Sequence, residues 1–184
     1  MKIQYPHTIE NGHGEKIIFH SETEEDGEKK LLVESFVQPG AGPIMHTHLL
    51  QDESLTVVSG EMTYRVMGQE PVKALPGETA LFKRGTAHNF VNSGNDLLVC
   101  KGWIKPANTI VFFLGGIFAA QKKSVTPRPV MFDAAYLMTR YRHEYDMPEL
   151  PFMVKKIINP LVYLIGRILG KYSHFKDAPE PVKK

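Results

Sequence analysis

The chain of 184 residues and 20.8 kDa holds 42% hydrophobic and 23% charged residues, close to the values of ordinary globular domains. The length allows one domain with an appendage and excludes two full-sized enzyme domains. The composition excludes wholesale disorder, a collagen-like fibre and a protein with many membrane spans. The formal net charge of +2 is too small to indicate nucleic-acid binding.

The charge is unevenly divided along the chain. Residues 1–105 hold 10 Lys/Arg against 14 Asp/Glu, net −4, whereas residues 106–184 hold 12 against 6, net +6. This change of sign predicts two regions, residues 1–106 and residues 107–184.

Cysteine use and the N-terminal residues bear on location. Cys100 is the only cysteine, so it cannot form an internal disulfide, and we expect it to be a buried, unreactive side chain. No apolar stretch near the N-terminus resembles a signal peptide, and the longest uncharged run, 106–121, is shorter than the roughly 20 apolar residues of a spanning helix. We therefore expect a cytoplasmic protein without a transmembrane segment.

Residues 16–105 have the pattern of a β domain. Turn sequences interrupt them at short intervals, namely QPGAGP, VSGE, MGQEP, LPGE, KRGT and NSGND. Residues 62–66 alternate, with Met62, Tyr64 and Val66 on one face of a predicted strand. Many short strands with regular turns predict a mainly β sandwich or barrel.

The residues after Pro106 have a helical pattern. A first helix is predicted from a cap at Asn108 or Thr109 to about residue 121, and a second over residues 132–145. A third segment, residues 150–170, contains Pro160, which should kink or divide it. Gly170 is a plausible helix stop, and we expect the last residues, DAPEPVKK, to be a frayed tail.

The third segment is amphipathic and basic. Its apolar residues recur at helical spacing, whereas Lys155, Lys156, Arg167 and Lys171 lie elsewhere around the helix. The apolar face has three possible partners: the outside of the barrel, a second copy of the chain, or an anionic membrane surface. We expect a homodimer and keep peripheral membrane contact through these helices open.

Two histidines two residues apart mark a possible metal site. In a strand, His46 and His48 project to the same face, and Glu53 can join them from the following strand. Two histidines and a carboxylate are a common ligand set for a divalent transition metal. A second block, from Gly77 to Asn92, adds His88 as a candidate fourth ligand.

The two blocks resemble the signature motifs of the cupin superfamily. The first has glycine, five residues, His-x-His, four residues, Glu53, six residues and Gly60; the second ends on Gly, two residues, His88, three residues and Asn. Lys83 stands where the family usually has proline, which concerns the turn and no ligand. The resemblance covers about residues 15–105 and implies a jelly-roll β barrel, followed here by a helical C-terminal extension.

The resemblance also implies that His46, His48, Glu53 and His88 hold a divalent ion such as Fe, Mn, Ni or Zn. We therefore expect a metal-dependent, dioxygenase-like enzyme that acts on a small oxygen-bearing substrate and does not bind nucleic acid. Glu53 is the candidate base, and Tyr64 is a second candidate catalytic residue because a phenol can protonate or hydrogen-bond a substrate. Two alternatives stay open: a non-catalytic small-molecule-binding cupin whose tail makes a dimer or membrane contact, and a Zn-dependent isomerase.

Overall fold

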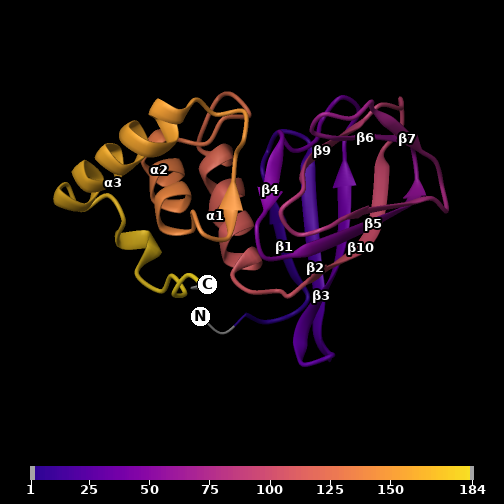
Figure 1. Ribbon diagram of the computed structural model, residues 1–184, viewed down its shortest axis with the longest axis horizontal. Coiled ribbons are helices and arrows are strands. Elements are labelled where there is room, and N and C mark those ends of the chain that lie inside the picture. The colour runs from indigo at the N-terminus through magenta and orange to yellow at the C-terminus, as the bar shows by residue number, and fades with distance from the viewer. Residues whose placement is uncertain (1–2, 183–184) are drawn as a thin grey trace.

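Two antiparallel sheets form the barrel in the computed structural model, which describes residues 3–182 (Figure 1). The larger sheet contains, in spatial order, β1 (His7–Glu10), β2 (Glu15–Glu25), β3 (Glu28–Val37), β10 (Leu98–Lys105), β5 (Asp52–Ser59) and β8 (Thr79–Phe82). The smaller contains β11 (Tyr145–Asp146), β4 (His46–His48), β9 (Ala87–Asn92), β6 (Met62–Val66) and β7 (Val72–Ala74). This arrangement confirms the predicted mainly β, jelly-roll fold.

The alternating pattern of residues 62–66 places side chains as predicted. Strand β6 pairs with β9 so that Met62 lies opposite Asn92 and Val66 opposite His88. Met62 is fully buried, and the core between the sheets also contains Val37, Leu55, Val57, Ala74, Ala80, Phe82, Phe90, Leu98 and Cys100. The expected burial of Cys100 is confirmed, and this burial raises the pKa of its thiol to about 11.

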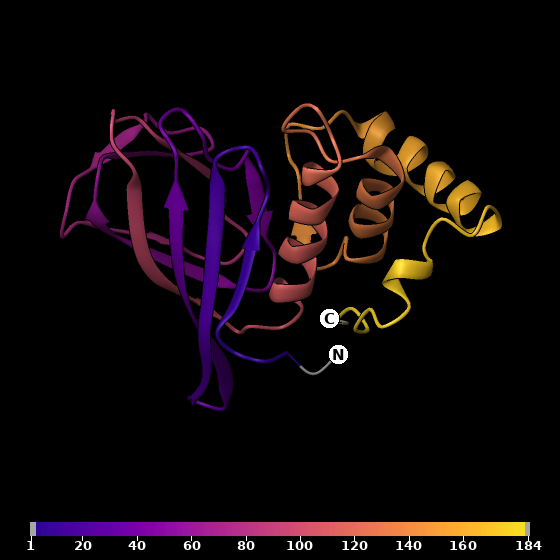
Figure 2. The same cartoon turned by 180° about the vertical axis from the view of Figure 1, so that it is seen from behind.

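Three helices follow the barrel: α1 (Ile110–Lys122), α2 (Met131–Arg140) and α3 (Asn159–Ile168). Figures 1 and 2 show α1 beside the barrel, α2 beyond it and α3 farthest away. Helix α1 has a strongly apolar sequence because it is covered on both sides. Its Ile110, Phe113 and Phe118 share a core with Ile9 and Phe19 of the barrel. The change from strand to helix falls between Lys105 and Ile110, close to the predicted boundary.

The second helix is shorter than the predicted 132–145. Helix α2 ends at Arg140, and Tyr145 and Asp146 instead form β11, which pairs with β4. The Tyr145 ring stacks on Phe113 at 3.9 Å between ring centroids. A buried aromatic contact and a strand pairing, both distant in sequence, override the local helical pattern.

The third predicted segment is one helix, over residues 152–168, and Pro160 does not divide it. A π-helical turn, Val154–Ile158, ends two residues before Pro160. A wider turn accommodates the missing backbone N–H of proline. The predicted stop is confirmed: Gly170 has φ of 65°, and the N–H of Lys171 donates to Gly166 O at 2.9 Å, as in a Schellman motif.

The expected frayed tail is instead packed as far as residue 182. The Tyr141 hydroxyl donates to Pro179 O at 2.7 Å, and the Val182 N–H donates to the buried Glu144 carboxylate at 3.0 Å. Residues 183–184 of that prediction lie outside the described residues. Among the helices of residues 3–182, none has both the length and the apolar character needed to cross a membrane.

Candidate metal centre

Four side chains from three strands converge on one point inside the barrel. His46 and His48 come from β4, Glu53 from β5 and His88 from β9. One candidate ligand atom from each residue lies within 4.8 Å of the other three. His46 lies opposite His88 in the β4–β9 pair, whereas Glu53 reaches the cluster from the other sheet. The predicted grouping of these four residues is therefore present in the structure.

The turn before β9 connects the strands that carry the cluster. The N–H of Gly85 donates to His48 O at 2.7 Å, which joins this turn to the end of β4. The N–H of Arg84 donates to Asp52 Oδ1 at 2.7 Å, and its guanidinium reaches Asp52 Oδ2 at 3.1 Å. Gly85 has φ of 82°, a conformation that favours glycine. The turn thus fixes the position of β9, which carries His88, relative to Asp52, the residue next to Glu53.

Backbone hydrogen bonds determine which imidazole nitrogens face the cluster. His46 Nδ1 donates to Ile44 O and His88 Nδ1 donates to Thr86 O, both at 2.9 Å. A carbonyl oxygen can only accept, so each Nδ1 carries the proton and each neutral ring presents an Nε2 lone pair. Metal-binding histidines in proteins commonly have this arrangement.

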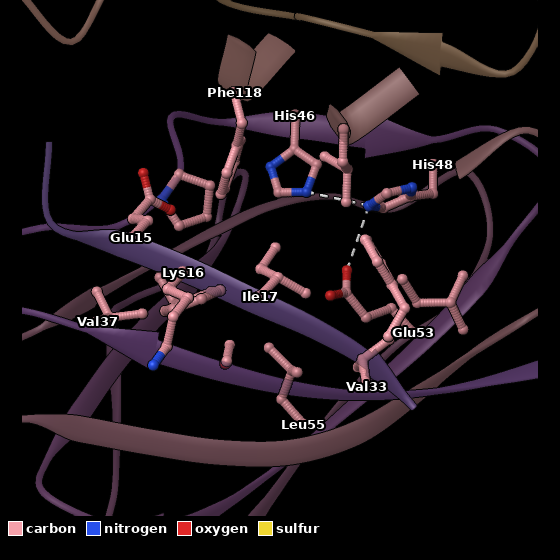
Figure 3. Close-up of a pocket in the computed structure, with 16 residues that line it drawn as sticks. Glu15, Lys16, Ile17, Val33, Val37, His46, His48, Glu53, Leu55 and Phe118 are labelled. Carbon is pink, nitrogen blue, oxygen red and sulfur yellow. Dashed lines mark hydrogen bonds and ion pairs between the residues drawn. The ribbon is translucent and has the colours of Figure 1, made fainter. Parts of the chain in front are cut away.

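The atoms at the centre of the cluster are mainly electron-pair donors. His88 Nε2 lies 3.1 Å from Glu53 Oε2. His46 Nε2 lies 3.1 Å from His48 Nε2 (Figure 3). His48 Nε2 lies 3.3 Å from Glu53 Oε2. With a neutral His88, its lone pair faces a carboxylate oxygen, an unfavourable contact that a cation between them would relieve. The donor set, three imidazole nitrogens and a carboxylate, therefore fits a divalent transition metal.

The electrostatics of the site keep His46 neutral and Glu53 charged. Burial, with the neighbouring His48 and His88, lowers the pKa of His46 to about 3. Burial alone would raise the pKa of Glu53, yet His48 and His88 hold it well below its ordinary value whenever their Nε2 atoms carry a proton and donate to it, and a metal would take the place of those protons. A neutral imidazole and an ionised carboxylate are the protonation states that bind a metal.

Aromatic rings support two of the histidines. Phe82 stacks on His88 at 4.0 Å between centroids and an interplanar angle of 4°. His48 differs from the other two, because its Nδ1 is buried without a hydrogen-bond partner among the described residues. Tyr145 contacts the His48 ring edge-on. The orientation of His48 therefore depends on packing more than on hydrogen bonding.

A small cavity of about 70 Å³ opens beside the cluster. His46, His48 and Glu53 lie on one side of it and Glu15 on the opposite side (Figure 3). Most of the remaining wall is apolar and includes Phe19, Val33, Leu55, Phe90, Leu114 and Phe118. A larger cavity of about 320 Å³, bounded by Tyr5, Glu22 and Asn108, contains none of the four cluster residues. The chemistry of the donor set favours the smaller cavity as the functional one.

Sequence reasoning missed Glu15 and the two residues of α1 in this wall. Burial raises the pKa of Glu15 to about 7, although Asn11 Nδ2 donates to its carboxylate at 2.8 Å. Nothing in the local sequence distinguishes Glu15 from the other carboxylates near it. Leu114 and Phe118 belong to a run that is apolar on all sides, and such a run does indicate burial.

Tyr64, the second candidate catalytic residue, lies in the barrel core near the cluster. It lies opposite Phe90 in the β6–β9 pair, and its ring packs edge-on against Phe82 at 5.6 Å between centroids. It is not among the residues that line the cavity beside the cluster. The structure therefore groups Tyr64 with the inner core, one ring removed from His88.

Comparison with known proteins supports the reading of the barrel. Residues 33–101 match the family model described as Cupin domain. In the comparison with curated proteins, no match was found.

Three solved structures illustrate what the barrel is similar to. KdgF from Halomonas sp. is 22% identical, with a TM-score of 0.46 over 53% of this chain and 85% of that one. A conserved protein with a double-stranded β-helix domain from Klebsiella pneumoniae is 26% identical, with a TM-score of 0.43 over 53% and 81%. A sugar phosphate isomerase of the cupin superfamily from Silicibacter pomeroyi is 21% identical, with a TM-score of 0.43 over 52% and 61%. On its two motifs, its two-sheet barrel and the family match over residues 33–101, the β region of this chain is a cupin domain.

Proposed function

We propose that this protein is a metal-dependent enzyme of the dioxygenase type that acts on a small oxygen-bearing organic substrate. The observation that carries the proposal is the convergence of three imidazole Nε2 atoms and one carboxylate beside a mostly apolar cavity. A structural metal site has no need of an adjoining cavity, whereas a catalytic one requires access for the substrate.

A divalent transition metal bound there would supply Lewis-acid polarisation of a substrate oxygen and, if redox-active, electron transfer to dioxygen. His46, His48 and His88 would hold the ion through their Nε2 atoms, and burial already keeps His46 neutral with its lone pair available. Glu53 Oε2 faces the histidines, and we assign Glu53 as the acceptor of the proton that a substrate hydroxyl loses on binding.

The shape and lining of the cavity restrict the substrate. Its volume of about 70 Å³ is well below the roughly 300–1,000 Å³ of typical ligand pockets. The apolar wall, with Phe118 and Leu114 of α1 on one side, excludes water and offers few hydrogen bonds. The proposal therefore favours a compact diol, diketone or enediol with a small apolar body.

The first test is metal content by elemental mass spectrometry, on the wild-type protein and on a His46→Ala/His48→Ala double variant. We expect one redox-active ion per chain in the wild type and none in the variant. Glu53→Gln checks the site without removing a ring, and His20→Ala is the matched control because His20 pairs with Glu34 on the outer surface. Circular dichroism verifies that each variant is folded.

The second test is oxygen uptake and product analysis with the metal-loaded protein. A panel of small diols, diketones and enediols should include a substrate that is consumed together with dioxygen. Zinc as the bound ion, with isomerised product and no oxygen uptake, would overturn the dioxygenase assignment. An unchanged panel with every reconstituted metal would overturn the enzymatic assignment and favour a non-catalytic cupin.

A further inference from the structure

The outermost helix of the protein is held on one side only. It covers residues 152–168 and contacts α2, away from the barrel (Figures 1 and 2). Gly166 is buried against the Tyr172 ring, and Tyr163 stacks with Tyr172 at 5.6 Å between centroids. Tyr136 of α2 packs against the same two tyrosines. These contacts fix which side of the helix faces inward.

The opposite side exposes large apolar side chains. Nine of them leave 41–77% of their surface open to solvent, and we name this set the outer apolar face: Phe152, Met153, Ile157, Ile158, Leu161, Leu164, Ile165, Ile168 and Leu169. Single exposed apolar residues are ordinary on protein surfaces, but a continuous row along one helix indicates an interaction site.

The charged residues of the segment that carries this face have one sign. Residues 150–176 contain five Lys/Arg and no Asp/Glu, although the whole chain holds 20 acidic residues. Lys155 pairs with Asp146 of β11 at 3.0 Å, whereas Lys156 and Arg167 are exposed and form no ion pair within residues 3–182. At 3.6 residues per turn, Arg167 lies about 100° around the helix from both the buried Gly166 and the exposed Ile168. It therefore stands at the border of the outer apolar face.

An anionic lipid surface suits this combination better than a second copy of the chain does. In a two-fold symmetric dimer, the face would pack on itself and bring two sets of cations together. The segment offers no carboxylate that could compensate them. A membrane interface provides apolar material for the leucines and isoleucines and negative headgroups for the lysines and arginine.

We propose that the outer apolar face binds peripherally to anionic membranes, with the helix lying in the plane of the interface. Leu161, Leu164 and Ile168 enter the boundary between headgroups and acyl chains, while Arg167 and Lys156 contact lipid phosphates. This attachment would place the metal-binding barrel on the far side of α1 and α2 from the lipid. The proposal is independent of the reaction assigned above.

Flotation of the full-length protein with lipid vesicles tests the proposal. The protein should co-float with vesicles of phosphatidylcholine mixed with phosphatidylserine, and less with phosphatidylcholine alone. The vesicle affinity of a Leu164→Ser/Ile168→Ser variant should fall about tenfold or more, because two apolar side chains that enter the membrane interface are removed. Added salt should weaken binding, as should Lys156→Ala/Arg167→Ala.

The matched control is Leu81→Ser, since Leu81 of β8 is 51% exposed and Leu164 is 53% exposed. It should leave flotation unchanged, and metal content should be the same in all variants. Size-exclusion chromatography with light scattering supplies the rival outcome. A dimer that Leu164→Ser/Ile168→Ser converts to monomer, without vesicle binding by the wild type, would overturn the proposal in favour of self-association. Vesicle binding that survives in that variant, or a monomer that binds no vesicles, would overturn it as well.

Discussion

Tyr145 lies directly opposite His48 in the β11–β4 pair, and its ring meets the His48 ring edge-on at 5.8 Å between centroids and 87° between planes. The Tyr145 hydroxyl contacts Gln51 Nε2 and Thr109 Oγ1, each at 3.2 Å. Since β11 follows α2, the C-terminal region forms part of the wall of the candidate metal centre. The barrel residues alone therefore do not complete the environment of His48.

Two substitutions of Tyr145 should separate the contribution of its ring from that of its hydroxyl. Tyr145→Phe keeps the contact with His48 and should lower the free energy of unfolding by about 1 kcal/mol through the lost hydrogen bonds. Tyr145→Ala leaves a cavity against Phe113 and should cost about 3–5 kcal/mol, with weaker metal binding in addition. Urea unfolding and metal titration measure the two effects. Equal metal affinity in both variants would show that Tyr145 does not orient His48.

The stacked pair of Phe82 and His88 leads to a second prediction. Phe82→Leu removes the planar surface that holds the His88 ring, so metal affinity should fall about 10-fold or more. Phe90→Leu is the matched control, because Phe90 belongs to the same core and stacks on no cluster histidine among the described contacts. Competition with a coloured chelator gives both affinities. A similar loss in the two variants would point to general loosening of the barrel.

The metal site could be anticipated from sequence to different degrees for different residues. The side-chain period of two in a strand is a local rule, and it places His46 and His48 together without further information. The approach of Glu53 and His88 depends on pairing between distant strands, so only the resemblance to a family of known fold could supply it. The order and pairing of the strands have the same non-local origin.

The main errors arose where long-range contacts decide local structure. Residues 141–145 carry no glycine that would mark the end of a helix. Packing on Phe113 and pairing with β4 nevertheless stabilise Tyr145 in a strand more than a continued helix would. Glu15 has no unusual neighbours in sequence, and its surroundings arise only when α1 covers the cavity. The helical spacing of the third segment was correct, but it could not show which side of α3 would face outward.

The half-buried carboxyl of Glu15 predicts a pH dependence of stability. Its pKa rises from 4.5 to about 7 on folding because it is buried, so the folded state retains a proton that the unfolded chain has released. The free energy of unfolding should therefore fall as the pH rises from about 4.5 to about 7, by up to roughly 3 kcal/mol, and then level off.

Glu15→Gln should remove this decline, because glutamine does not ionise and can keep the contact with Asn11. Glu10→Gln, at an exposed carboxyl of β1, is the control and should leave the decline in place. Urea unfolding at a series of pH values measures both. An unchanged profile in Glu15→Gln would mean that another group titrates in this range.

Adjacent glycines in α1 should respond in opposite ways to alanine. A Cβ on Gly115 would meet only Ile9 Cγ2 at 3.8 Å, an ordinary contact, so Gly115→Ala should raise the free energy of unfolding by about 0.5–1 kcal/mol through higher helix propensity. A Cβ on Gly116 would lie 2.9 Å from Leu137 Cδ1, and Leu137 is fully buried with little room to move. Gly116→Ala should therefore destabilise the protein by about 1–3 kcal/mol. Thermal unfolding of the two variants measures both effects. Helix propensity favours alanine at both sites, so a stabilising Gly116→Ala would mean that α1 and α2 pack less closely than the structure shows.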